Sequence, residues 1–264
     1  MDPSPFPNTN PIISIKNLHK SYGDKQVLKG IQLDVYKGQV LGYIGPNGAG
    51  KSTTVKILCG LLTEFEGEVL VNGVNVQTNP VMAKKMIGYV PELAELYDVL
   101  SPREFLSLMG DLYEMEPVIC QERLVKMMGA FGLSDNVDQR MDTFSKGMKQ
   151  RVLLISGIIH NPEIIILDEP LSGLDANSVI MVKELINRLA KEGKTIFYCS
   201  HMMDVVEKVS DRIIVIDKGS IVADGSFEEL QKKDGNESLE KIFAHLTSGA
   251  SGDIATDELM RAFD

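Results

Sequence analysis

The residues best suited to chemistry are Gly45–Thr53, which read Gly-Pro-Asn-Gly-Ala-Gly-Lys-Ser-Thr. They fit the Gly-x-x-x-x-Gly-Lys-[Ser/Thr] pattern, in which glycines let successive backbone N–H groups point at phosphate oxygens. Lys51 can reach the β- and γ-phosphates of a nucleotide, and the Ser52 hydroxyl can ligate Mg²⁺. The pattern predicts a nucleotide site whose other loop contacts are Gly45, Asn47, Gly48, Ala49, Gly50 and Thr53.

The segments on either side of this loop would position it. Gln39–Ile44 is predicted to be a buried strand, and Lys51–Leu62 carries apolar residues at helical spacing. The loop would then join a strand to the N-terminus of a helix, where anions are favoured. The alternative is a glycine-rich turn that binds nothing.

A second group of candidate residues follows the apolar run Ile164–Leu167, which is typical of a strand buried on both faces of a parallel sheet. The run ends in Asp168 and Glu169. Two acids there would be costly unless they meet a cation or lie in a solvated cleft. We expect Asp168 to hold Mg²⁺ and Glu169 to activate an attacking water, whereas a solvated turn is the alternative.

Three more residues have both a structural and a functional interpretation. His201 follows the predicted strand Thr195–Cys199, at the edge where open α/β sheets bind ligands, although a lone histidine is usually structural. Tyr22, beside a glycine, could stack on an adenine ring or simply pack. Ser145 is placed to cap a helix that runs to Ile159.

Turn and capping signals outline the rest of the chain. Asn72-Gly73 lies between apolar runs and predicts a β-hairpin. Ser101 and Glu104, with proline between them, predict a capping box. The stretch from Leu93 to about Ile159 is mostly helical in pattern, so we expect a helical lobe inserted in an α/β body.

The composition limits the classes of function. The chain has 264 residues, of which 44% are apolar, and can bury a sizeable core. Its net charge of −10 argues against a sequence-independent grip on nucleic acid. Its three scattered cysteines predict reduced thiols and no zinc site. The longest apolar runs fall short of the roughly 18 residues that span a bilayer.

Taken together, the motifs from Ile12 to Gly225 resemble those of ATP-binding-cassette (ABC) ATPases, the nucleotide-binding subunits of membrane transporters. By this resemblance Tyr22 is the adenine-stacking aromatic. The motifs in chain order are Walker A at Gly45–Thr53, the glutamine-loop segment Ile87–Glu92, the signature Phe144–Met148, Walker B at Ile164–Glu169 with its catalytic Glu, the D-loop Ser172–Asp175 and the switch histidine His201.

The sequence departs from the family pattern at two places that matter. Glu92 stands where the family has glutamine, so we assign it to the metal site with Ser52 and Asp168. Lys146 replaces the first signature glycine, which leaves Ser145 and Gly147 to contact the γ-phosphate. The residues of both motifs resemble those of the family branch that serves exporters of drugs, antimicrobial peptides or ions.

The resemblance implies an α/β fold: a P-loop NTPase core with a mixed or parallel sheet, an antiparallel β subdomain and a helical subdomain at about 93–160. We expect a disordered tail at 1–10 and the nucleotide-binding domain at 11–232. Residues 233–264 would form a C-terminal helix and a flexible tail.

The implied function is ATP binding and hydrolysis that energise transport, of the export type, through a separate membrane-spanning permease. Two copies would pair head to tail, so that each ATP lies between one Walker A loop and the other copy's Ser145–Gly147. Lys51, Glu169 and His201 would be catalytic, with Mg²⁺ as cofactor. Leu96, Tyr97 and Leu100 would contact the permease, which would hold the chain on the cytoplasmic face of the membrane. The alternative is the ATPase of a soluble assembly or repair machine.

Overall fold

The computed structural model describes residues 10–93, 96–235 and 237–247. The flexible tail expected after Ser248, and the N-terminal tail apart from Asn10, lie outside this range. Within the described residues the strands form two sheets, one mainly parallel and one antiparallel. The predicted α/β fold with a mixed sheet and an antiparallel sheet is thereby confirmed.

The larger sheet has the strand order β10–β9–β3–β8–β7–β6 among the described residues. All neighbours in it run parallel except β9 and β10, which are antiparallel. Its central strands are buried at every residue, which explains their continuous apolar runs. The strands are β3 (Val40–Ile44), β6 (Ile87–Val90), β7 (Ile164–Asp168), β8 (Thr195–Cys199), β9 (Arg212–Asp217) and β10 (Ser220–Gly225).

The antiparallel sheet has the order β2–β1–β4–β5 in the described part of the chain. The turn of its β4–β5 hairpin is Asn72-Gly73, as predicted, and both residues have the positive φ that a tight two-residue turn of this type requires. The strands are β1 (Ile13–Tyr22), β2 (Lys25–Val35), β4 (Glu66–Val71) and β5 (Val74–Asn75).

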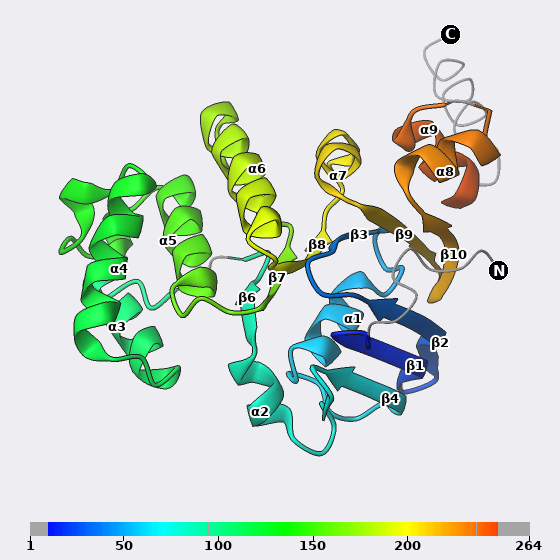
Figure 1. Ribbon diagram of the computed structural model, residues 1–264, viewed down its shortest axis with the longest axis horizontal. Coiled ribbons are helices and arrows are strands. Elements are labelled where there is room, and N and C mark those ends of the chain that lie inside the picture. The colour runs from blue at the N-terminus through cyan, green and yellow to red at the C-terminus, as the bar shows by residue number, and fades with distance from the viewer. Residues whose placement is uncertain (1–9, 94–95, 236, 248–264) are drawn as a thin grey trace, which may run out of the picture.

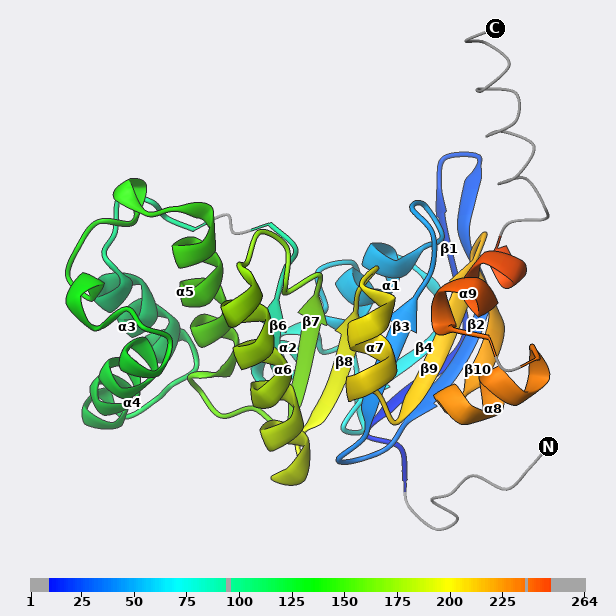
Figure 2. The same ribbon diagram turned by 90° about the horizontal axis from the view of Figure 1, so that it is seen from above.

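The helices divide between the body and a lobe at one end of the molecule (Figures 1 and 2). Helix α1 lies between the two sheets, and its apolar side chains share a core with residues of both. Helices α3, α4 and α5 form the lobe. The bounds are α1 (Lys51–Leu58), α2 (Pro80–Lys85), α3 (Pro102–Leu112), α4 (Pro117–Ala130), α5 (Lys146–Ile158), α6 (Ala176–Lys191), α7 (Met203–Val209), α8 (Phe227–Lys233) and α9 (Leu239–Thr247).

Helix α1 ends four residues before the predicted end at Leu62, so that part of the prediction was wrong. Gly60 has φ +62°, a left-handed conformation that ends the helix. The N–H of Leu61 donates to the carbonyl of Lys56, which closes the last turn. The apolar spacing suggested a longer helix because Leu62, which follows the turn, also packs against the core between the two sheets.

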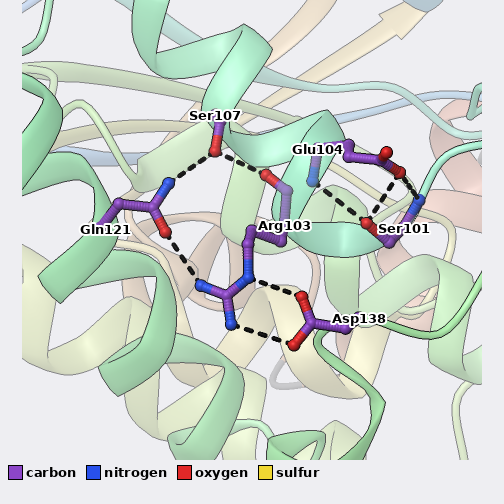
Figure 3. A network of polar contacts seen from close by, with 6 residues as sticks. All are labelled: Ser101, Arg103, Glu104, Ser107, Gln121 and Asp138. Atoms are coloured by element: carbon purple, nitrogen blue, oxygen red, sulfur yellow. Dashed lines mark hydrogen bonds and ion pairs between the residues drawn. The ribbon is translucent and has the colours of Figure 1, made fainter.

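A polar network joins two helices of the lobe (Figure 3). Arg103 of α3 donates from Nε and Nη2 to the carboxylate of Asp138, at 2.6 and 3.1 Å. Its Nη1 donates to Gln121 of α4, which in turn donates to Ser107 of α3. The guanidinium therefore fixes α3 against α4 and against the chain that leads to α5.

The predicted capping box at the start of α3 is present. Ser101 accepts from the backbone N–H of Glu104, and the Glu104 carboxylate accepts from the N–H of Ser101. We expect Ser101→Ala to lower the free energy of unfolding by about 1 kcal/mol, and Ser101→Gly by only about 0.3 kcal/mol, because glycine is tolerated at an N-cap. Urea denaturation measures both; an alanine variant as stable as the glycine variant would contradict the capping role.

The chain's three cysteines, Cys59, Cys120 and Cys199, are all free and buried. Burial raises the pKa of each thiol above its ordinary value. None of the described helices is both long and apolar enough to span a membrane.

Candidate functional site

The candidate site is a cleft of about 560 Å³ beyond the carboxyl ends of four neighbouring parallel strands. The glycine-rich loop follows β3, Glu92 follows β6, Asp168 and Glu169 stand at the end of β7, and His201 follows β8 (Figure 1). Because the strands are parallel, these segments meet at one edge of the sheet. The cleft is lined by Lys25, Val27, Asn47, Gly48, Gly50, Lys51, Ser52, Thr53, Glu92, Asp168, Glu169 and His201.

The loop has a backbone that side chains would obstruct. Gly48 and Gly50 have φ of +80° and +113°, which is the left-handed region. A Cβ on Gly45 would lie 2.3 Å from the carbonyl oxygen of Ile216, so only glycine fits there. Lys51 Nζ donates to the carbonyl of Gly45 at 2.6 Å and to that of Pro46 at 3.3 Å. The loop is thus curled around the lysine ammonium at the start of α1.

Gly45 and Ala49 belong to the loop but do not line the cleft. Ala49 is buried, and its carbonyl accepts from the N–H of Gly219 at 3.0 Å. That bond joins the loop to the turn between β9 and β10. These residues support the loop from behind, while Asn47, Gly48 and Gly50 face the cleft.

Asp168 is 5% exposed and lies among other acids. Burial is the largest cause that raises its pKa, the charges of Glu169 and Glu92 add to it and those of Lys51 and Lys56 oppose it, so that the pKa lies at about 6. A carboxylate in such a position gains from a cation that replaces lost hydration. Within the described residues no group of three or more His, Cys, Asp or Glu side chains is arranged to hold a metal ion. Protein carboxylates alone therefore do not form a complete metal cage.

Glu169 and His201 contact each other across the ends of β7 and β8. His201 Nδ1 lies 2.8 Å from Glu169 Oε2, and the His201 backbone N–H donates to the same oxygen at 3.3 Å. Glu169 has φ +49°, a conformation that costs on the order of 1–3 kcal/mol for a non-glycine residue. Its N–H donates to the carbonyl of Cys199 at 2.9 Å. The strained turn directs the carboxylate into the cleft.

Other predicted site residues lie outside the cleft. Tyr22, 48% exposed, stands at the end of β1, with Lys20 Nζ 5.1 Å from its ring centroid. Ser145 and Gly147 lie at the start of α5. Ser145 caps this helix as predicted, because its Oγ accepts from the N–H of Met148.

The sequence interpretation did not identify Lys25 and Val27 as cleft residues. Both are on β2, just after the turn that follows Tyr22. The one available signal was their closeness in sequence to that tyrosine, because no motif marks them.

Comparisons with known proteins agree on one family. Residues 28–172 match the family described as ABC transporter. The linearmycin resistance ATP-binding protein LnrL of Bacillus subtilis (strain 168) is 35% identical over 86% of this chain and 73% of its own length. The Nod factor export ATP-binding protein I of Rhizobium meliloti (strain 1021) is 33% identical over 85% of this chain and 72% of its own length.

A solved structure extends the likeness to three dimensions. It is the dimeric post-hydrolysis state of the ATP-binding cassette MJ0796 bound to ADP and Pi. It has a TM-score of 0.75 and 25% identity, and the match covers 81% of this chain and 98% of that one. With its phosphate-loop cleft and its paired Glu169 and His201, this chain belongs to the ABC transporter family, as an ATP-binding subunit with ATPase activity.

Proposed function

We propose that this chain energises export through a separate membrane-spanning permease, and that it does so as a head-to-tail dimer with ATP at each interface. The observation that carries the proposal is the division of the predicted site. Lys51, Asp168, Glu169 and His201 line one cleft, whereas Ser145 and Gly147 lie outside it at the start of α5. A second copy of the chain would complete the cleft with these two residues.

In this proposal three cleft side chains, Lys51, Glu169 and His201, act on the phosphates and on the attacking water. Backbone N–H groups of the loop and Lys51 bind the β- and γ-phosphates. Glu169 accepts a proton from the attacking water. His201, held against Glu169 at 2.8 Å, contacts the γ-phosphate and keeps the carboxylate oriented.

The donor set fits Mg²⁺. This ion binds through one or two carboxylates together with phosphate oxygens and water, rather than in a cage made only of protein. Ser52 and Asp168 offer a hydroxyl and a buried carboxylate to the cleft, and Glu92 offers a second carboxylate. When bound, the ion would neutralise charge on the phosphates.

In the proposed dimer, closure depends on ATP because the second copy supplies some of the contacts to the γ-phosphate. Ser145 and the N-terminus of α5 offer hydrogen-bond donors to an anion. These contacts form only when two copies meet, so ATP favours the closed pair, and hydrolysis with product release reopens it. The similar cassette is dimeric in its post-hydrolysis state with ADP and Pi, which supports the pairing of two copies.

The proposed permease surface lies directly after Glu92. Tyr97 is 66% exposed there, whereas Leu96 and Leu100 are partly buried against a core that the lobe shares with the larger sheet. The exposed apolar residues that accompany Tyr97 are Leu93 and Val99. This surface would hold the chain at the cytoplasmic face of the membrane. The resistance and export proteins named above favour export, and they favour a transporter over a soluble machine.

The test is the mass of the Glu169→Gln variant with and without MgATP, measured by analytical ultracentrifugation. We expect a monomer without nucleotide and a dimer with it. A strict monomer in saturating MgATP at high protein concentration would contradict the dimer. Co-purification with a membrane-spanning protein from detergent-solubilised membranes tests the permease, and repeated recovery of the chain from the soluble fraction alone would contradict it.

We expect Tyr22→Ala to weaken ATP binding by roughly 5- to 150-fold, because stacking of a base on an aromatic ring contributes about 1–3 kcal/mol. Tyr22→Phe keeps the ring and should bind ATP as the wild type does. Equilibrium titration with a fluorescent ATP analogue measures both variants. Equal affinity of Tyr22→Ala and Tyr22→Phe would remove Tyr22 from the site.

A further inference from the structure

Gln150 is a buried polar residue of α5 that the proposed mechanism leaves unused. It is 1% exposed, and its Nε2 donates to the carbonyl oxygen of Pro170 at 3.1 Å. A buried amide needs such a partner, since an unpaired one is costly. Its position is informative because Gln150 belongs to the helical lobe, whereas Pro170 directly follows Glu169. One hydrogen bond thus joins the lobe to the turn that holds the proposed catalytic base.

A second contact lies one turn earlier on α5. A Cβ built on Gly173 would lie 2.8 Å from Cε and 2.9 Å from Cδ of Lys146, so the lysine stem fills the space beside this glycine. Gly173 has φ +76°, which favours glycine there. The first two turns of α5 therefore contact both ends of the segment 170–173: Gln150 contacts Pro170, and Lys146 lies beside Gly173.

The turn that α5 contacts contains the left-handed Glu169. Such a backbone persists only where its surroundings hold it. Among the described residues, the N–H of Glu169 donates to Cys199, and the N–H of Ser172 donates to the carbonyl of Glu169. Both are backbone bonds. The bond from Gln150 comes from a side chain, so a substitution can remove it without altering the turn's own sequence.

We propose that Gln150 is a positioning residue for Glu169: it ties the strained turn to α5, so that the orientation of the lobe sets the position of the carboxylate. This inference rests on the proposed function, because it takes Glu169 as the base. Ser145 begins the same helix, five residues before Gln150. A γ-phosphate bound at Ser145 in one site would therefore act, through α5, on the catalytic turn of the chain that supplied this serine.

The test is Gln150→Met, which keeps the length of the side chain and removes the amide donor. We expect kcat for MgATP hydrolysis to fall about 10- to 100-fold, because a small displacement of a catalytic group has effects of this size. KM and the equilibrium affinity for ATP should stay within about twofold, because the loop that binds phosphate is untouched. A structural defect alone would not produce this separation of kcat from KM.

The matched control is Gln121→Met, which removes another hydrogen-bonded glutamine amide of the lobe, the one in the Arg103 network (Figure 3). It should keep the wild-type kcat. An equal loss in both variants, or a wild-type kcat in Gln150→Met, would contradict the positioning role. A wild-type chain that neither binds nor hydrolyses MgATP would instead contradict the proposed function itself.

If Gln150→Met does not fold, the contact between Lys146 and Gly173 provides a second test of the inference. Lys146 is exposed, so its variants should fold. Lys146→Met keeps the stem beside Gly173, and Lys146→Gly removes it. We expect a lower kcat for the glycine variant than for the methionine variant, and equal kcat values would overturn the inference.

Discussion

Replacing Glu169 with Gln is expected to lower phosphate release by about 100-fold or more while ATP affinity stays at the wild-type level. Glutamine has nearly the same shape as glutamate, but its amide does not accept a proton from water. The His201 N–H, 3.3 Å from the carboxylate in the wild type, still finds an oxygen to bond. The turn with its positive φ should therefore persist. Phosphate release under saturating MgATP, together with an equilibrium ATP titration, measures the two quantities.

A matched control lies at the other end of the same strand. Glu163 precedes β7 as Glu169 follows it, and it forms an exposed ion pair with Lys37 at 3.3 Å. Glu163→Gln should release phosphate at the wild-type rate, because this end of the sheet is away from the cleft. Near-normal turnover of Glu169→Gln would remove Glu169 from the role of base. A loss shared with Glu163→Gln would show a general effect of removing an acid.

Replacing Lys51 with Ala is expected to have the other large effect, on binding as well as on hydrolysis. A hydrogen bond to a charged group contributes about 1.5–3 kcal/mol, so MgATP affinity should fall about 10- to 150-fold. The loop loses support too, because Lys51 Nζ donates to the carbonyls of Gly45 and Pro46. Hydrolysis at saturating MgATP should fall as well, since in the proposed role the ammonium binds the β- and γ-phosphates. Calorimetric titration and a phosphate assay measure these losses.

Lys37→Ala is the control for this variant. Lys37 precedes β3 and Lys51 follows it, so the two lysines stand at opposite ends of one strand. Lys37 is 65% exposed and its ion pair with Glu163 is on the surface, where such pairs contribute little. We expect wild-type affinity from this variant. If Lys51→Ala binds MgATP as tightly as Lys37→Ala, the loop is not the phosphate site.

The local parts of the fold could be predicted because their signals are contained in a few neighbouring residues. The strand Thr195–Cys199 is marked by an unbroken buried run, the turn Asn72-Gly73 by its glycine, and the cap at Ser101 by a serine–glutamate spacing. Helix α1 shows the limit of such signals. Its apolar spacing continues to Leu62, but Gly60 turns the chain after Leu58.

The parts of the site that could not be predicted depend on which strands become neighbours. The contact between Glu169 and His201 exists because β8 pairs with β7, and the residues between them in sequence form a helix. The bond from Gln150 to Pro170 likewise needs the lobe to lie against the sheet. No spacing of residues in the sequence indicates either of these two contacts. The resemblance to a family led to the proposed roles of Tyr22 and Ser145, and the structure places both outside the cleft.

The buried thiols described above have a practical consequence. A maleimide reacts with an accessible thiolate. Cys59, Cys120 and Cys199 are buried, and burial also raises the pKa of each thiol and so disfavours the thiolate. A cysteine introduced on the outer surface would therefore take up a fluorophore or a spin label selectively in the natural background. Pairs of such labels, one on the lobe and one on the body, would report any change in the distance between the two during turnover without prior removal of any native sulfur.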